Sequence, residues 1–147
     1  MQLHDATTLH YDLRLELDGV LRSWAVPKGP SLDPGVKRLA VPVPDHELAA
    51  GDFEGVHEGA TRGSGAVIVW DEGTFDLVRE TAAHLSFVLH GTKLRGGFAL
   101  TRTGPRRWIL VKEVDDDARR GSDVAREEPA SVRSGRTWQE VAGQAPS

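Results

Sequence analysis

One stretch decides the fold of this chain: HDATTLHYDLRLEL, residues 4–17. From Leu9 to Leu17, apolar residues alternate strictly with polar ones. Such an alternation is typical of a β-strand with one buried face. Because side chains at positions i and i+2 of a strand share a face, His10, Asp12 and Arg14 are predicted to project together from an apolar wall.

The polar face of this strand suits a metal ion with an anion beside it. An imidazole and a carboxylate at this spacing can share one ion, and His4 can supply a third ligand from just upstream. Oxygen and imidazole donors without sulfur favour Mn²⁺, Fe²⁺, Zn²⁺ or Mg²⁺. The guanidinium of Arg14 can hold an anion next to that ion. The alternative is a solvated polar face, which most alternating strands have.

The composition limits the class of protein. The chain has 147 residues, which suits one domain. No apolar run approaches the roughly 18 residues of a transmembrane helix, no signal-peptide pattern opens the chain, and the lack of cysteine excludes disulfides and thiolate metal sites. We therefore expect a cytoplasmic protein. A net charge of −4 and a pI of about 5.8 argue against broad nucleic-acid coating, but they allow a local site for one strand end.

The rest of the chain predicts a succession of short strands. Asp18-Gly19 is a two-residue turn signal, and Val20–Val26 returns as the second strand of a hairpin. Eight strands and almost no helical periodicity predict an all-β fold, a small closed or nearly closed barrel, because closure removes exposed edges. The other six strands are expected at residues 37–43, where Pro42 indicates an edge or a bulge, and at 66–70, 74–79, 85–90, 97–102 and 108–113.

The composition changes near residue 115. We expect the barrel domain to occupy residues 1–114 and residues 115–147 to form a charged, largely flexible tail. Within the tail, Thr137 and Glu140 have the spacing of a capping box, which indicates a short helix at 137–142. Trp138 would then be able to dock on the barrel.

Other candidate residues lie in or near the loops. His46 can act as a ligand, a general acid or a phosphate donor, although a surface-loop histidine is the simpler interpretation. Lys28, in a loop rich in proline and glycine, and Arg38, at the start of a strand, can contact phosphate; ordinary surface charge is the alternative for both. His57 is a weaker candidate.

These motifs together resemble the 3′-phosphoesterase module of bacterial ligase D, which also occurs as a free-standing protein. The resemblance covers about residues 2–113. It is carried by His4-x5-HYDLRLE (10–16), SWAVPKGPSLDP (23–34), KRLAV (37–41), DH (45–46), DFEG (52–55), VIVWD (67–71), FxLHGxKLxG (87–96) and WxLxK (108–112).

The resemblance implies a β-barrel with its active site on the outer surface and a divalent metal, usually Mn²⁺. It implies removal of a 3′-terminal ribonucleoside to leave a 3′-phosphate, and then removal of that phosphate to leave a 3′-OH, during double-strand-break repair by end joining. The implied partners are DNA 3′ ends and ligase, polymerase or Ku-type proteins, and we expect a monomer. By motif, His4, His10 and Asp12 match the metal ligands; Arg14 and His46 match the groups on the scissile phosphate, and Arg38 and Lys28 match supporting basic positions.

The sequence departs from the family pattern on the phosphate side. Ala50 stands where the family has a tyrosine that contacts the phosphate, the segment 54–63 lacks the family's proline and tyrosine, and Val43-Pro44 replaces Val-Glu. The chain also begins three residues before His4, where relatives have a leading strand. These departures predict weaker activity or the loss of one step.

Two alternatives follow from the same residues. A His-x-Asp motif with a distal histidine is also the pattern of Fe(II) oxygenases, although those need a longer chain to enclose a co-substrate. A catalytically weakened module that binds DNA ends or repair partners is the other alternative, and Ala50 favours it.

Overall fold

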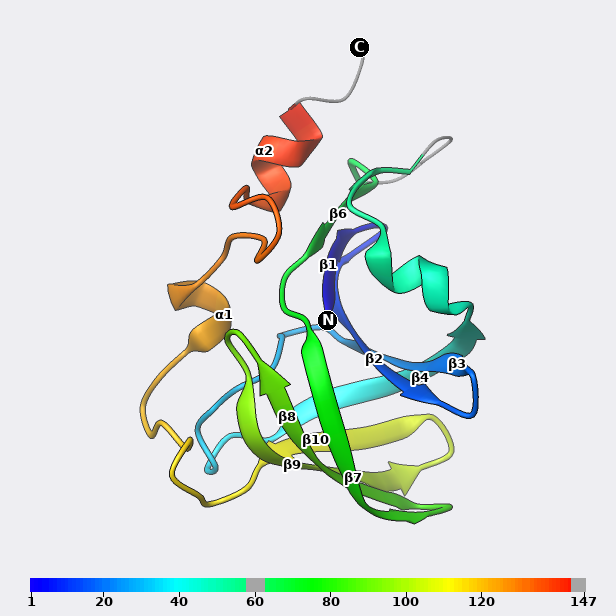
Figure 1. The fold of residues 1–147 in the computed structure, drawn as a ribbon, viewed down its shortest axis with the longest axis vertical. Helices are drawn as coiled ribbons and strands as arrows, with labels where there is room; N and C mark the ends of the chain where they lie inside the picture. The colour runs from blue at the N-terminus through cyan, green and yellow to red at the C-terminus, as the bar shows by residue number, and fades with distance from the viewer. Residues whose placement is uncertain (58–62, 144–147) are drawn as a thin grey trace.

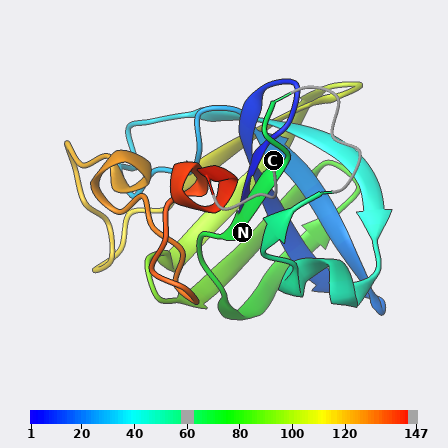
Figure 2. The same cartoon turned by 90° about the horizontal axis from the view of Figure 1, so that it is seen from above.

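The computed structural model describes residues 1–57 and 63–143, and it forms one curled antiparallel sheet of ten strands (Figures 1 and 2). The strand order is β5-β6-β1-β2-β3-β4-β10-β9-β8-β7. In chain order the strands are β1 Gln2–Asp5, β2 Leu9–Leu17, β3 Val20–Val26, β4 Arg38–His46, β5 Gly55–Val56, β6 Ala66–Val69, β7 Gly73–Thr81, β8 His84–Gly91, β9 Arg95–Gly104 and β10 Arg107–Lys112; the helices are the 3₁₀ helix η1 Leu48–Asp52, α1 Val124–Glu127 and α2 Trp138–Gly143.

The all-β prediction is confirmed, but the sheet is not closed. Within the described residues, β5 and β7 lie at its two ends and do not pair with each other. The predicted count of eight strands is too low because β1 and β5 are missing from it. With four and two residues, these strands are too short to show a period-two pattern.

The hairpin of β2 and β3 forms as the sequence predicts. Asp18 and Gly19 both have positive φ, 53° and 80°, as a two-residue turn with the twist of the flanking strands requires. Leu13 and Leu15 of β2 are buried, and the intervening polar residues lie on the outer face. The core fills the inner face of the curled sheet; its members include Leu3, Leu13, Trp24, Ile68, Trp70, Phe87, Phe98, Leu100 and Leu110.

The segment after residue 114 packs on the sheet, so the prediction of a largely flexible tail is wrong for its described part. Val124 and Val141 are each 3% exposed and belong to the core cluster. The indole Nε1 of Trp70 donates to the Glu128 carbonyl oxygen at 2.8 Å. Helix α2 lies where a short helix is predicted, and Thr137 and Glu140 form the capping box. The composition of this segment does not indicate that it packs on the sheet, because its anchors are single apolar residues that lie between charged ones.

Glu54 ties this C-terminal segment to the sheet. One of its oxygens accepts from the Val69 N–H at 2.8 Å and from the Ser131 hydroxyl at 2.5 Å. Arg133 adds ion pairs to Asp52 at 2.7 Å and to Glu72 at 2.5 Å. Partial burial raises the pKa of Glu54, but hydrogen bonds from Ser131, Ser134 and Val69 and the charge of Arg136 outweigh burial and lower this pKa below 4.5.

This arrangement predicts a pH-dependent loss of stability for Glu54→Gln. A carboxylate whose pKa is lowered by folding stabilises the protein above its unfolded-state pKa, and the stabilisation is lost as the pH falls through the folded-state pKa. We expect the variant to lose about 1 kcal/mol at neutral pH, since the site is only partly buried, and to approach the wild type below the folded-state pKa. Thermal unfolding across this pH range, with the exposed Glu113→Gln as control, measures it. A constant difference at all pH values would contradict the role of the charge.

Among the described residues, the helices are all too short and too polar to cross a membrane.

Candidate active site

A cavity of about 750 Å³ opens on the outer face of the sheet, between β1, β2, the end of β4 and η1. It contains five of the seven site residues that the sequence predicts. The residues lining it are Gln2, His4, His10, Asp12, Arg14, Val43, His46, Glu47, Ala49, Ala50, Phe53, His57 and Val67.

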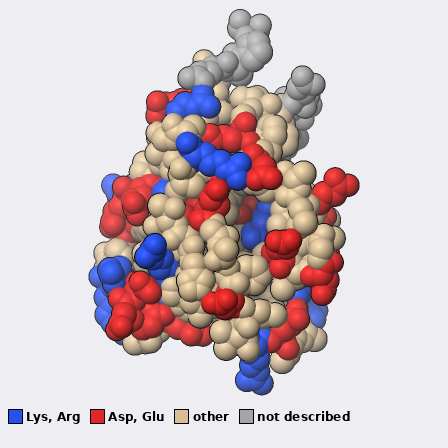
Figure 3. Space-filling view, viewed as in Figure 1, with Lys and Arg blue, Asp and Glu red and all other residues tan. Residues whose placement is uncertain are grey.

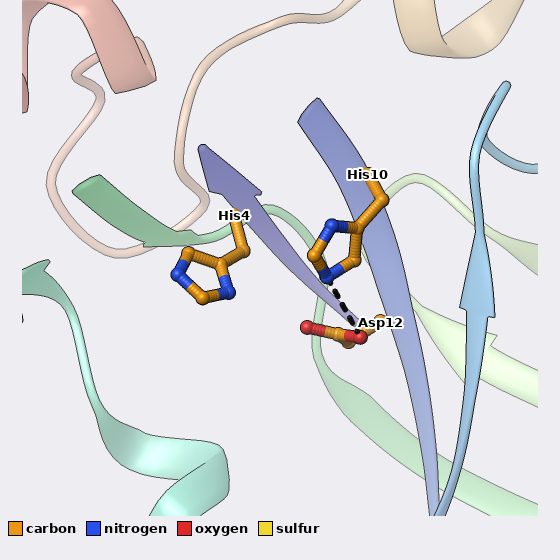
Figure 4. Close-up of side chains that lie close together, drawn as sticks. All are labelled: His4, His10 and Asp12. Carbon is orange, nitrogen blue, oxygen red and sulfur yellow. Dashed lines mark ion pairs between the residues drawn. The ribbon is translucent and has the colours of Figure 1, made fainter. Parts of the chain in front are cut away.

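The three predicted metal ligands meet at one side of this cavity (Figure 4). His4 of β1 is the cross-strand partner of His10 of β2, and Asp12 follows two residues later on the same face. One ligand atom from each of the three residues lies within 4.8 Å of the other two. Asp12 is only 6% exposed, so its carboxylate is held beneath the two imidazoles.

The hydrogen bonds of His10 show which of its nitrogens can bind a cation. Nδ1 lies 3.0 Å from the Thr8 carbonyl oxygen, and a carbonyl can only accept, so Nδ1 carries a proton. Nε2 lies 3.3 Å from Oδ1 of Asp12. In neutral His10, two lone pairs would therefore face each other, an arrangement that a proton or a metal ion between them stabilises. The hydrogen bond to Asp12 accordingly raises the pKa of His10, and the donor set fits a divalent ion.

His4 is prepared to act as a neutral ligand. Partial burial and the nearby imidazole of His10 lower its pKa, and Asp12 opposes this shift. An imidazole must be unprotonated to ligate a metal. The environment of His4 therefore favours the ligating form.

Arg14 is the centre of a hydrogen-bond network beside the triad. Its Nε donates to Oε1 of Gln2 at 2.6 Å, and one terminal nitrogen donates to Oγ of Ser23 and Nδ1 of His46, both at 2.9 Å. The other terminal nitrogen lies 3.7 Å from Oδ2 of Asp12. Burial lowers the pKa of Arg14, and the charge of Asp12 opposes that shift. The guanidinium is thus fixed with one edge directed toward the metal ligands.

A β-bulge brings His46 to this network. Ser23 pairs with Val43 and Leu21 pairs with His46, so β4 advances three residues where β3 advances two. The extra residue places His46 on the same face as Val43, whereas in a regular strand the two would lie on opposite faces. The bulge predicted from Pro42 is therefore present in β4. Because a guanidinium can only donate, Nδ1 of His46 accepts from Arg14, and the neutral ring carries its proton on Nε2.

The cavity wall beside His4 contains Gln2, which the sequence did not single out, and His57, which was a weaker candidate. Nε2 of Gln2 donates to the carbonyl oxygens of Ala50 and Phe53, both at 2.9 Å, so Gln2 joins η1 to Arg14. The His57 ring stacks on Phe53 with centroids 4.4 Å apart and lies 5.4 Å from the His4 ring. Gln2 has the i, i+2 spacing to His4 that would have revealed it in a longer strand; His57 follows a glycine-rich stretch that carries no such signal.

Arg38 and Lys28 are not brought to the cavity. Arg38 pairs with Leu110 of β10, and cross-strand partners share a face; Leu110 is buried, so Arg38 lies on the side of the core. Its Nε is buried and has no hydrogen-bond partner within residues 1–57 and 63–143. Lys28 is exposed in the loop after β3. The structure gives no direct support to the predicted phosphate contacts of Lys28 and Arg38.

Comparison with known proteins shows the family to which this chain belongs. A family model described as the DNA ligase D 3′-phosphoesterase domain matches residues 2–102. The chain is 54% identical over 148 residues to the multifunctional non-homologous end joining protein LigD of Pseudomonas aeruginosa, an alignment that covers 93% of this chain. It is 43% identical over 113 residues to the LigD of Mycobacterium tuberculosis strain H37Rv, covering 74% of this chain. The chain belongs to the DNA ligase D 3′-phosphoesterase domain family.

The match covers only a small part of each relative. The chain spans 18% of the length of the Pseudomonas protein and 15% of the Mycobacterium tuberculosis protein. A LigD of Mycolicibacterium smegmatis is 34% identical over 136 residues, which are 85% of this chain and 18% of that protein. These relatives therefore contain most of their sequence outside the part that this chain resembles.

Proposed function

We propose that this chain is a metal-dependent phosphoesterase that repairs DNA 3′ ends, first removing a 3′-terminal ribonucleoside and then the remaining 3′-phosphate. One observation carries the proposal: the His4, His10 and Asp12 donors share a cavity with the hydrogen-bonded pair of Arg14 and His46. Metal donors beside a fixed guanidinium are the combination that phosphoryl chemistry needs. The family model's description and the end joining named for its relatives support the substrate class and the repair process.

The metal ligands would be His4, His10 and Asp12. Mn²⁺ is our proposed ion because it accepts mixed imidazole and carboxylate donors. When bound, a divalent ion supplies Lewis-acid stabilisation of the negative charge on a phosphate oxygen.

The chain's own groups would bind the phosphate and stabilise the charge that develops on it. The edge of the Arg14 guanidinium that faces the metal ligands would neutralise charge that develops on the phosphate oxygens. In the first step, water adds to phosphorus and the bond from phosphorus to the ribonucleoside O5′ breaks. The Nε2–H of His46 would donate a hydrogen bond to a phosphate oxygen, and the proton that O5′ gains would come from the attacking water. Ser23 and Gln2 hold Arg14 in place for this role.

The test uses two primer-template substrates with Mn²⁺, one ending in a 3′-ribonucleotide and the other in a 3′-phosphate. We expect a 3′-phosphate product from the first and a 3′-OH product from both. An active member of the family is assayed in parallel on the same two substrates under the same conditions. No turnover of either substrate, while the relative is active, would overturn the proposal. The family match gives no support to the alternative of an iron oxygenase.

A second candidate function is a weakened module that binds 3′ ends without efficient turnover. Ala50 lines the cavity, and its methyl group offers no hydrogen-bond donor to a phosphate. Its carbonyl oxygen is already engaged by Gln2. Affinity for 3′ ends together with metal binding and no turnover would favour this candidate.

Ala50→Tyr distinguishes the two candidates. A hydroxyl at this wall would add one donor toward the bound phosphate, and a hydrogen bond to a charged group contributes about 1.5–3 kcal/mol. We therefore expect kcat/KM to rise about tenfold or more, measured on the 3′-phosphate primer. Ala49→Tyr, at a neighbouring cavity position, is the control for added bulk. Unchanged or lower activity in Ala50→Tyr would show that the phosphate side is complete without this donor.

A further inference from the structure

A cation that the cavity does not use lies on the outer face of the sheet. Arg107 is the first residue of β10, and its side chain is exposed. Within residues 1–57 and 63–143, its guanidinium has no hydrogen-bond or ion-pair partner, unlike Arg14, Arg22 and Arg133. Arg106, in the turn before it, is also exposed.

The strand register places Arg107 on the same face as the metal ligands. Asp12 pairs with Ala25, and Ala25 pairs with Val41. Leu39, two residues before Val41 and so on its face, pairs with Ile109. The pairing of β10 with β4 ends at Trp108 and Ala40. The register shift between Arg107 and Trp108 places its extra residue, Thr103, on β9, so β10 itself stays regular. Arg107, two residues before Ile109, therefore shares its face and extends the row one position beyond the last pair, beside Val41. Asp12, Ala25, Val41 and Arg107 thus form one row across four neighbouring strands.

Between Asp12 and Arg107, this row contains no charged side chain. Ala25 and Val41 occupy it, with Ser23 and Val43 beside them, and none of these four residues can repel a phosphate. Three inter-strand steps of about 4.8 Å give about 15 Å from Asp12 to Arg107. This distance corresponds to about four nucleotides at a rise of about 3.4 Å for each nucleotide of a strand.

We propose that this row carries the DNA strand on the 5′ side of the scissile phosphate, and that Arg107 binds one of its backbone phosphates. The inference rests on the proposed function. In a strand whose scissile phosphate lies at its 3′ end, nearly all nucleotides lie on the 5′ side, so any contact that this strand makes so far from the triad is with its 5′ side. In Figure 3, acidic and basic side chains are interspersed on the face in view. A local contact, rather than a broad basic surface, is therefore what an acidic protein can offer to DNA.

The test compares wild type, Arg107→Gln and the control Arg79→Gln. Arg79 is an exposed arginine on β7, three strands farther along the sheet. Each variant is measured with Mn²⁺ on a 3′-phosphate dinucleotide and on a 3′-phosphate primer of about 12 nucleotides, over a range of salt concentrations. The primer is used both as a single strand and annealed to a template, and an effect of Arg107→Gln on the duplex alone would assign the contact to the template and overturn the inference. Binding of the same primer by fluorescence anisotropy, without turnover, is measured in parallel.

For Arg107→Gln we expect the primer KM and Kd to rise about 3- to 10-fold, with kcat unchanged. The slope of log Kd against log salt should become shallower by about 0.7–0.9, the contribution of one phosphate contact. The dinucleotide and the Arg79→Gln control should show no change. An unchanged salt slope, or equal effects of both substitutions, would overturn the inference. If no substrate turns over, the proposed function fails, and the binding measurement still decides the role of Arg107.

Discussion

Asp12→Asn is expected to lower kcat on a 3′-phosphate primer by at least about 10³-fold. The carboxylate serves both halves of the site, since Oδ1 lies 3.3 Å from His10 and Oδ2 lies 3.7 Å from Arg14. Asparagine has nearly the same shape but no charge. It would leave two imidazoles as the remaining metal donors and remove the anion that orients Arg14. Mn²⁺ affinity should fall by at least about 10²-fold.

Calorimetric titration with Mn²⁺ and steady-state kinetics measure the two effects separately. The chain offers a matched control in Asp76→Asn, because Asp76 forms a second His–Asp pair with His90, 2.7 Å apart, on an exposed part of β7 and β8. The control should retain wild-type metal affinity and turnover. If Asp12→Asn keeps its metal affinity, Asp12 is not a ligand.

Arg14→Lys is expected to lower kcat by about 10²–10³-fold, which is about 2.7–4 kcal/mol of transition-state stabilisation. Lysine keeps the positive charge, but it lacks the planar fork that bonds Gln2, Ser23 and His46 at once. His46 would lose the donor to its Nδ1 and with it the fixed orientation of its Nε2–H. Geometry, rather than charge, is therefore the property that this substitution removes.

The two substitutions should separate the metal side of the cavity from its phosphate side. Arg14→Lys should bind Mn²⁺ with nearly wild-type affinity while losing turnover, because Arg14 provides no metal ligand. Thermal unfolding of the same sample confirms that the variant is folded. Turnover within about twofold of wild type would show that charge alone at this position is sufficient.

Local pattern was enough to predict the first hairpin and the most important face of the site. Strict alternation from Leu9 to Leu17 placed His10, Asp12 and Arg14 together, and Asp18-Gly19 supplied the turn. These features depend only on the period of a strand and on the conformations a turn requires. The structure adds distances and partners to them, but it does not change their arrangement.

The remainder of the site depends on contacts between distant segments. Gln2 acts through the carbonyl groups of η1, about fifty residues away, and no local pattern encodes such a bond. Arg38, at the start of a strand, was expected to contact the phosphate together with Arg14. In the structure Arg38 pairs with Leu110, and this pairing places Arg38 on the core side of the sheet. The pairing register between two strands cannot be predicted from the residue pattern of one strand alone. The C-terminal segment was misjudged for a related reason, since its anchors, Val124 and Val141, are isolated apolar residues.

The bulge in β4 has a consequence for how this family can vary. The direction of His46 depends on the bulge, because His46 lies three residues after Val43 and a regular ladder with this spacing would turn the imidazole to the opposite face. The side chains of Pro44 and Asp45 are exposed, so their contacts do not hold the bulge in place. A one-residue deletion here would put the histidine two residues after Val43, on the same face of a regular strand. The bulge and the three-residue spacing must therefore be kept together or lost together for His46 to reach Arg14.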